Sequence, residues 1–372
     1  MKVPLLDLKA QHRAIRESVV AKVLELADAQ LFILGKPVEE LEARIAELSR
    51  ARFGVGVASG TDALLVPLKA LDLKPGDEVI TSPFTFFASA GAIHNAGARP
   101  VFADIDPVTF NIDPAAVEAA ITPRTRAIMP VHLFGQMAAM ERLVPLAARH
   151  GIPLLEDAAQ AIGARRRVDG AWRMAGELGT VTGFSFFPSK NLGGWGDGGM
   201  VVANDERIAA RVRSLRTHGG LQMYHHDEVG TNSRLDALQA VVLLAKLPHL
   251  AAWSAARRAN AARYGELLAG LPSVRTPATD PANEHIFHQY VIEAERRDEL
   301  LAHLKAKDVG CAVYYPLALH LQPCFRYLGH RAGAFPASEA ATRRVLALPV
   351  YPELSQAEQQ YVAETIRGFY GT

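Results

Sequence analysis

Short apolar runs alternate with helical patterns between residues 53 and 215, and no other feature of the sequence constrains the fold as strongly. Most of these runs are continuous stretches of Val, Ile, Leu and Phe, which are typical of strands covered on both faces. The alternation predicts an α/β fold with a mostly parallel seven-stranded sheet. We expect its strands at 53–58, 78–82, 100–104, 126–131, 152–156, 181–186 and 200–203, and helices at 61–71, 88–96, 114–121 and 140–150.

The pattern changes after about residue 235. Helical stretches at 235–247 and about 255–268 are followed by a strand at 286–294, a helix at 297–307 and a strand at 311–315. We therefore expect a large α/β domain over 1–250 and a small α+β domain over 251–372. The segment 217–233 has no periodicity, and loops of that length are usually functional or lie at an interface.

Composition excludes several classes of protein. The 40 basic and 39 acidic residues give a net charge of +1, which argues against a nucleic-acid partner. With 49% hydrophobic residues the chain can build a sizeable core, yet no apolar run approaches the roughly 18 residues of a membrane span. The first residues lack the apolar region of a secretory signal. Cys311 and Cys324 cannot form a disulfide framework, so we expect a cytoplasmic globular protein.

Lys190 is the only lysine between Lys74 and Lys246, in a chain with ten lysines and thirty arginines. It lies in a polar, glycine-rich turn directly after the apolar run 181–186. A lysine beside low-dielectric strands has a lowered pKa, so its neutral amine can attack a carbonyl and form a Schiff base. The alternative is an ordinary surface lysine. Residues 194–199 match G-x-G-x-x-G, but a strand follows where a dinucleotide site needs a helix, so we reject that interpretation.

Three further groups follow predicted strands. The segment Ser59-Gly60-Thr61-Asp62 begins a helix. Its free backbone N–H groups could bind one phosphate, or the segment could be an ordinary helix cap. Asp157 directly follows the run 152–156, where it could keep a pyridine nitrogen protonated or cap a following helix. Phe86 could stack on a flat ring or belong to the core. A lysine, a phosphate seat, an acid and an aromatic side chain are together what pyridoxal 5′-phosphate (PLP) requires.

The whole chain resembles the sugar aminotransferases of the DegT/DnrJ/EryC1/StrS family, which have the fold type I PLP architecture. The resemblance rests on SGTDAL (59–64), PFTFFAS (83–89), EDAAQ (156–160), SFFPSKNLGGWGDGG (185–199) and NSRLDALQA (232–240). It implies that Lys190 forms the Schiff base and that Asp157 pairs with the pyridinium nitrogen. It further implies that the ring hydroxyl contacts Gln160, that Phe86 stacks on the ring, and that the phosphate is held by Gly60, Thr61, Ser185 and, from the neighbouring subunit, Asn232.

The same resemblance implies amino transfer from L-glutamate, which leaves as 2-oxoglutarate, to a nucleotide-diphosphate keto-sugar in a homodimer with shared active sites. The motifs favour a 3-keto hexose over a 4-keto sugar, in amino-sugar biosynthesis of the lipopolysaccharide or O-antigen kind. Tyr314, Tyr315 and His320 are expected near the substrate, although a tyrosine pair is as often core. Another fold type I enzyme, such as a dehydratase or lyase, stays open. A non-catalytic regulatory protein would be expected to lose Lys190 or Asp157.

A metal site is not expected. The sequence His225-His226-Asp227 places candidate ligands next to one another. Neighbouring side chains diverge, and no second cluster of ligands converges on this one.

Overall fold

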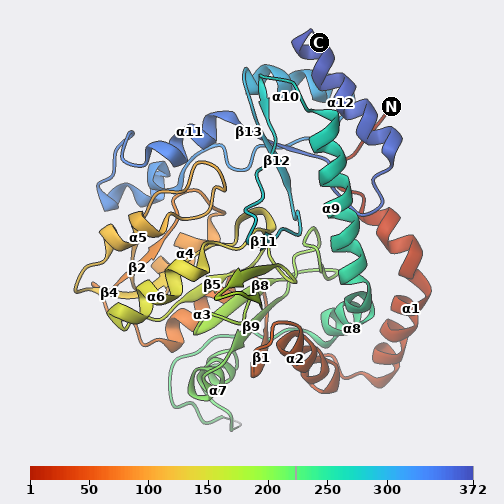
Figure 1. Cartoon of the computed structure of the whole chain (residues 1–372). Coiled ribbons are helices and arrows are strands. Elements are labelled where there is room, and N and C mark those ends of the chain that lie inside the picture. Colours follow the sequence, from red (N-terminus) through yellow and green to blue (C-terminus); the bar gives the residue numbers. More distant parts are fainter. Residues whose placement is uncertain (223, 372) are drawn as a thin grey trace.

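Seven strands form the centre of the computed structural model, which describes residues 1–222 and 224–371 (Figure 1). They are hydrogen-bonded as two groups, β3-β2-β4 and β1-β9-β8-β5, and β4 is linked to β5 by isolated parallel bridges at Ile128–Leu154 and Val131–Asp157. Only β9 runs antiparallel to its neighbours. The mostly parallel α/β fold is confirmed, although the ladder is not one continuous seven-stranded sheet. The strands are β1 (Phe53–Val57), β2 (Glu78–Thr81), β3 (Arg99–Phe102), β4 (Thr125–Met129), β5 (Leu155–Asp157), β8 (Val181–Ser185) and β9 (Gly199–Ala203).

Helices cover both faces of these strands, and this explains why the strands are continuously apolar. In β9, Val201 packs into one hydrophobic cluster and Val202 into the opposite one, and both are fully buried. Alternate residues of a strand point to opposite faces, so a strand between two helical layers needs apolar residues at every position. One layer contains α3 (Asp62–Ala70), α4 (Ala88–Asn95) and α7 (Glu206–Leu215); the other contains α2 (Lys36–Leu48), α5 (Pro114–Ala120), α6 (Met140–His150) and α8 (Ala237–Lys246).

A second core lies at the end of the molecule where both termini are found (Figure 1). It is built on the antiparallel sheet of β10 (Val274–Arg275), β12 (Tyr290–Ala294) and β13 (Val345–Leu348), with α9 (Leu250–Leu267), α10 (Arg297–Ala306) and α12 (Gln356–Tyr370) packed around it. Val3 belongs to this core and pairs with Val309. The division at residue 250 stays a prediction, and these contacts attach the first residues of the chain to the C-terminal unit.

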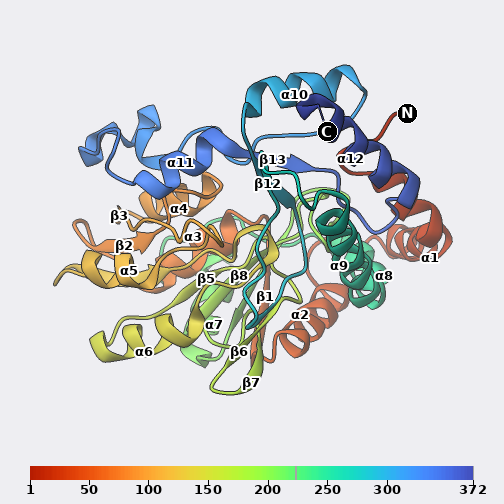
Figure 2. The ribbon, with the colours of Figure 1, turned by 45° about the horizontal axis from the view of Figure 1, so that its top comes forward.

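The remaining elements connect or cover these two units. Figure 2 shows the long helix α1 (Leu8–Ala29) beside α8 and α9, and α1 packs against α8. A hairpin of β6 (Arg165–Val168) and β7 (Ala171–Met174) extends through β11 (Asn283–Glu284) into a small sheet. Short turns of helix occur at Leu133–Gly135, Leu247–His249, Leu319–Leu321 and Pro323–Leu328, and α11 spans Pro336–Arg344.

Three expectations for the C-terminal half were wrong in detail. The strand expected at 311–315 does not form, because only Ala312 bridges β13 while the two tyrosines after it turn toward a cavity. The strand expected at 286–294 begins only at Tyr290. Helix α9 begins at Leu250 because Pro248 lies in a short turn and helical structure resumes directly after it.

One helical stretch departs from the expectation that no segment could span a membrane. Among the described residues, Ala237–Leu267 is long and apolar enough to do so by length and composition. Half of its most apolar window is buried inside the protein, as in core helices that pass the same test. The finding therefore carries little weight.

Candidate active site

A cavity of about 430 Å³ opens at the carboxyl ends of β5 and β8. Parallel α/β sheets place their sites at this edge, because the turns that follow the strands converge there. Nine of the predicted site residues line the cavity: Gly60, Thr61, Phe86, Asp157, Gln160, Ser185, Lys190, Tyr314 and Tyr315.

Lys190 lies in the turn after β8. The Lys190 N–H donates a hydrogen bond to the carbonyl of Phe187 (2.8 Å), which fixes this turn. No side chain or carbonyl among the described residues accepts a hydrogen bond from its Nζ. Burial lowers the pKa of Lys190 to about 8, although the charge of Asp157 opposes the shift. A neutral, nucleophilic amine is therefore accessible at far lower pH than for an ordinary lysine.

The turn between β1 and α3 offers free amides. Ser59 caps the helix, because its Oγ accepts the N–H of Asp62 (3.1 Å). The N–H groups of Gly60 and Thr61 have no acceptor among the described residues. A Cβ on Gly60 would lie 2.5 Å from the Cβ of Ser185, so only glycine lets the backbone approach that hydroxyl. The cap and the free amides, which could bind an anion, therefore occupy different residues of one motif.

Asp157 is 4% exposed at the end of β5, and no helix follows it directly, so it is not a helix cap. Its Oδ2 accepts a hydrogen bond from Ser89 Oγ (2.7 Å), which lies 3.1 Å from Thr85 Oγ1, and its Oδ1 accepts the N–H of Ala159 (3.2 Å). Burial raises the pKa of Asp157, and the bonds from Ser89 and Ala159 oppose this shift. The carboxylate is thus desolvated and held in one orientation.

The neighbouring Glu156 points the other way and is fully buried. His132 Nε2 lies 2.7 Å from Glu156 Oε2, and the N–H groups of Gly176 and Gly179 donate to the same carboxylate. Burial would raise the pKa of Glu156, but the hydrogen bonds from His132 and the two glycines outweigh it and lower the pKa. This network fixes the chain behind Asp157.

Gln160 connects both units of the molecule. Its Oε1 accepts the N–H of Phe134 (2.7 Å) and its Nε2 donates to the hydroxyl of Tyr315 (3.0 Å). Phe84 packs edge-on against Tyr315 and is the core residue of its turn, whereas Phe86 is 58% exposed at the cavity. An aromatic face exposed beside a cavity is available to a flat ligand.

The lining residues that were not predicted include four polar ones near the lysine or from a distant loop: Ser189, Asp197, His288 and Gln289. His288 Nδ1 lies 3.1 Å from Asn191 Oδ1, and burial, followed by the charge of Lys190, lowers the pKa of His288 well below its usual value. The imidazole beside Lys190 is therefore neutral. Gln289 Oε1 is buried without a partner. Ser189 and Asp197 belong to the same sequence segment as the lysine. His288 and Gln289 come from a distant loop that has no recognisable motif.

Three groups lie outside this cavity. His320 is 1% exposed, lies 3.1 Å from Glu339 Oε1 and packs against Phe335, so its predicted place beside the substrate gains no support. Asn232 is exposed and does not line the cavity of its own chain. His225 pairs with Asp227 (3.2 Å) on the surface, and no three His, Cys, Asp or Glu side chains within 1–222 and 224–371 could hold a metal ion.

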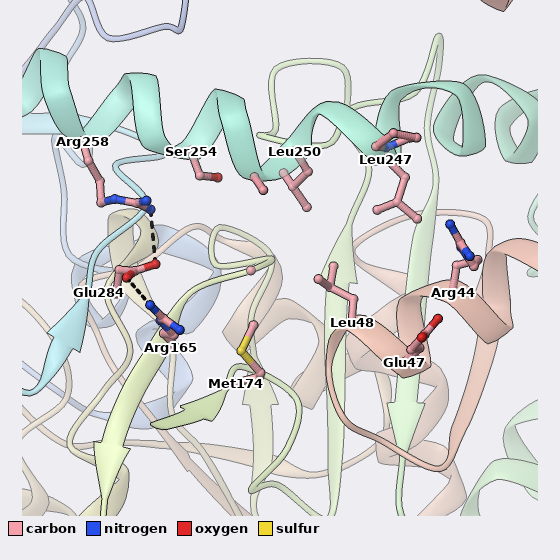
Figure 3. A pocket seen from close by; sticks show the side chains of 13 residues that line it. Arg44, Glu47, Leu48, Arg165, Met174, Leu247, Leu250, Ser254, Arg258 and Glu284 are labelled. Carbon is pink, nitrogen blue, oxygen red and sulfur yellow. Dashed lines mark hydrogen bonds and ion pairs between the residues drawn. The ribbon is translucent and has the colours of Figure 1, made fainter. Parts of the chain in front are cut away.

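A larger cavity of about 590 Å³ lies between α2, the β6–β7 hairpin and the start of α9 (Figure 3). Three of its five charged side chains are paired with one another, since Glu284 bridges Arg165 (2.7 Å) and Arg258 (3.4 Å). The wall between them is apolar, and none of the predicted site residues lies there. Size alone therefore does not select the functional site.

The smaller cavity has the chemistry that PLP requires. Lys190 supplies an unengaged amine, Gly60 and Thr61 supply free amides next to Ser185, and Asp157 supplies a buried carboxylate. These donors fit a phosphate, an aldehyde and a pyridine nitrogen, and Phe86 is free to cover a flat ring. Fold and site together define a PLP-dependent enzyme of fold type I.

Comparison with known proteins gives the family. The model of the DegT/DnrJ/EryC1/StrS aminotransferase family matches residues 13–367, and the chain belongs to this family. It is 50% identical to a pleiotropic regulatory protein of Geobacillus stearothermophilus over 100% of this chain and 99% of that one. It is 45% identical to a UDP-N-acetyl-3-dehydro-alpha-D-glucosamine 3-aminotransferase of Acidithiobacillus ferrooxidans, over 98% and 97%. The crystal structure of S. venezuelae DesV superposes with a TM-score of 0.96 at 43% identity, covering 100% and 99%. The protein is thus a PLP-dependent aminotransferase.

Proposed function

We propose that Lys190 carries the cofactor and that Asp157 keeps its ring nitrogen protonated. The observation that carries this proposal is the convergence, in one cavity, of the only lysine of 75–245 with a buried strand-end carboxylate. Gly60, Thr61 and Ser185 would hold the phosphate, Gln160 the ring hydroxyl, and Phe86 would cover the ring. When bound, PLP supplies a carbonyl that condenses with amines and a ring that takes up electrons.

The residues of this chain divide the work of the reaction. Lys190 Nζ, once released by the incoming amino donor, would take a proton from the donor carbon and return it within the same cavity. Its lowered pKa suits both directions of transfer near neutral pH. The neutral His288 would not compete for that proton, because burial, followed by the charge of Lys190, lowers the pKa of His288 and disfavours its protonated form. Asp157, fixed by Ser89, would stabilise positive charge on the ring side.

For the substrates, we propose L-glutamate as amino donor and a nucleotide-diphosphate 3-keto hexose as acceptor. The Acidithiobacillus relative, whose name places amination at C3 of a UDP-linked sugar, covers nearly the whole of this chain and supports the acceptor class. The alternative is a 4-keto sugar. Tyr314 and Tyr315 line the cavity and are the candidates for contact with the sugar, whereas His320 lies elsewhere. Amino sugars of the lipopolysaccharide or O-antigen kind are the products we expect.

An assay of 2-oxoglutarate release from L-glutamate against dTDP- and UDP-linked 3-keto and 4-keto sugars tests this proposal. We expect turnover with a 3-keto sugar and little with its 4-keto isomer; preference for the 4-keto isomer would contradict the choice of carbon. Glutamate alone should convert the bound cofactor to its amine form, which separates an aminotransferase from a dehydratase or lyase. The regulatory name of the Geobacillus relative leaves this test unchanged, since both Lys190 and Asp157 are present.

We further propose a cytoplasmic homodimer in which Asn232 reaches the phosphate of the neighbouring site. Two observations support this. Asn232 is exposed outside its own cavity, and Leu221 and Val229 of the same loop are 74% and 90% exposed, which leaves apolar surface for a partner to cover. Asn232→Ala removes a hydrogen bond to a charged group, which costs about 1.5–3 kcal/mol, so PLP retention should weaken roughly 10- to 100-fold.

Mixed dimers distinguish the two arrangements. In a heterodimer of one Lys190→Ala chain and one Asn232→Ala chain, an Asn232 that acts across the interface leaves one of the two sites fully wild type. An Asn232 that acts within its own chain leaves both sites defective. A heterodimer that binds PLP no better than the Asn232→Ala homodimer would refute the shared site.

A further inference from the structure

A second lysine is buried close to the lysine turn but outside the cavity. Lys246 is 5% exposed at the end of α8, and its Nζ donates a hydrogen bond of 2.7 Å to the carbonyl of Gly193. No carboxylate within the described residues pairs with it, and burial lowers its pKa to about 8. Burying a cation without an ionic partner costs free energy. The hydrogen bond of Lys246 goes to the loop that contains Lys190, so we ask what that contact does for the loop.

The same face of α8 holds that loop at a second point. Gln239 lies seven residues before Lys246, about two helical turns, so both side chains project from one side of the helix. Gln239 Oε1 accepts the N–H of Trp195 at 2.7 Å. One helix thus supplies a donor for the carbonyl of Gly193 and an acceptor for the N–H two residues later.

The glycines of the loop make this close contact possible. A Cβ on Gly194 would lie 2.6 Å from Gln239 Oε1, and one on Gly193 would lie 2.3 Å from the carbonyl of Pro188. A side chain at Gly194 would displace the Gln239 amide, whereas one at Gly193 would meet the backbone of Pro188 within the loop itself. The loop that begins three residues earlier at Lys190 is therefore shaped to fit against α8.

We propose that Lys246 and Gln239 are positioning residues that clamp the 190–196 loop to α8 and so fix the backbone that carries Lys190. Neither lines the cavity, so both act through the loop rather than on a ligand. The proposal uses Lys190 as the attachment point and so rests on the proposed function. The physical clamp itself can be measured without the cofactor.

Hydrogen–deuterium exchange on cofactor-free protein tests the clamp. Lys246→Met keeps the length and apolar stem of the side chain but removes the donor. We expect amides within 191–196 to exchange about 10- to 100-fold faster, because losing a hydrogen bond from a charged donor loosens the loop locally. Thermal stability should stay unchanged or rise, since a buried charge is also removed. A purely structural lysine would instead lower thermal stability without singling out this loop.

Gln359→Met is the matched control. Gln359 is fully buried in α12 and its Nε2 donates to the carbonyl of Asn260 (2.8 Å), so this variant also removes a buried donor to a backbone carbonyl. Exchange within 191–196 should not change in it. Unchanged exchange of that segment in Lys246→Met overturns the proposal. Should Lys246→Met not fold, Gln239→Met tests the same clamp: faster exchange there supports it, and unchanged exchange overturns it.

The loaded enzyme gives an independent readout. PLP should dissociate about tenfold faster from Lys246→Met than from the wild type, while borohydride reduction still fixes the cofactor on Lys190. An unchanged dissociation rate would overturn the coupling of the clamp to the cofactor site. A reduced adduct on another lysine would instead refute the proposed attachment point and leave the exchange result standing.

Discussion

Replacing Asp157 by Asn removes one charge from the candidate site and almost nothing else. The carboxylate is 4% exposed and uses one oxygen for Ser89 and the other for Ala159. In Asp157→Asn the amide oxygen can still accept the N–H of Ala159. The new NH₂ group can donate to Ser89 Oγ, which in turn can donate to Thr85 Oγ1, 3.1 Å away. The hydroxyl pair reverses its direction and no buried group is left without a partner.

Stability should therefore hardly change, and the effect should fall on catalysis. Burial already disfavours the charged form of Asp157, which raises its pKa, so losing the charge removes a desolvation cost. The cofactor ring, in contrast, would lose the negative partner that we propose for its nitrogen. Removing a preorganised electrostatic partner typically costs about 100-fold or more in turnover, or about 2.7 kcal/mol in activation free energy.

The assay is the single-turnover reaction of L-glutamate with the PLP-loaded enzyme, followed by visible absorbance, together with thermal unfolding. We expect a rate about 100-fold lower with an unchanged unfolding midpoint. A rate within twofold of wild type would mean that Asp157 is only a local structural residue and that the proposed cofactor orientation is wrong. A large fall in the midpoint would refute the account of its hydrogen bonds.

Three more outcomes are expected. Glu156→Gln should destabilise the fold by about 1–3 kcal/mol in a denaturant titration, because the N–H donors of His132, Gly176 and Gly179 converge on its two oxygens and one of them would face an NH₂ group; equal stability would contradict this. The rate of PLP uptake by cofactor-free protein should rise with pH and reach half its maximum near pH 8, where Lys190 loses its proton, and a midpoint near 10.5 would show an ordinary lysine. Borohydride should fix PLP on Lys190, and Lys190→Ala should bind PLP without a reducible linkage; a reduced adduct on Lys36 or Lys246 would refute the assignment.

Sequence reasoning located the central strands because burial on two faces leaves an unmistakable pattern. All seven were placed within a few residues, and α6 was predicted with its exact ends. The β6–β7 hairpin was missed, although Asp169-Gly170 between two short runs is a strong turn signal. Three consecutive arginines in β6 do not show the apolar pattern of a strand, so the hairpin was not recognised. Only Arg166 of the three turns inward, where it pairs with Glu141 and Asp280. The strand predicted at 311–315 does not form, because Cys311 and Val313 pack into hydrophobic clusters while the two tyrosines line the cavity.

Residues of the candidate site were predictable where they stand next to a strand end, as Lys190 and Asp157 do. His288 and Gln289 could not be found in this way, because they reach the cavity from a loop roughly 100 residues beyond Lys190 and no local pattern marks them. His320 is the reverse case, a predicted residue that does not line the cavity. The resemblance places it near the substrate, whereas in the structure it lies in a short helical turn and packs against Phe335, so its role beside the substrate stays a prediction.

The glycine-rich run 193–199 shows why a motif needs its three-dimensional context. Read as a string it matches a dinucleotide fingerprint, in which glycines let a backbone approach a pyrophosphate. Here β9 follows at once, and the glycines let the backbone approach protein instead: Gly194 lies against Gln239, and a Cβ on Gly199 would lie 2.3 Å from the carbonyl of Ser59. The first contact lies between the loop of Lys190 and α8, and the second brings the start of β9 against the turn before α3, which we propose holds the phosphate. In both cases the glycines allow another group to come close to the backbone. Whether that group is a pyrophosphate or another part of the protein determines the function of the motif.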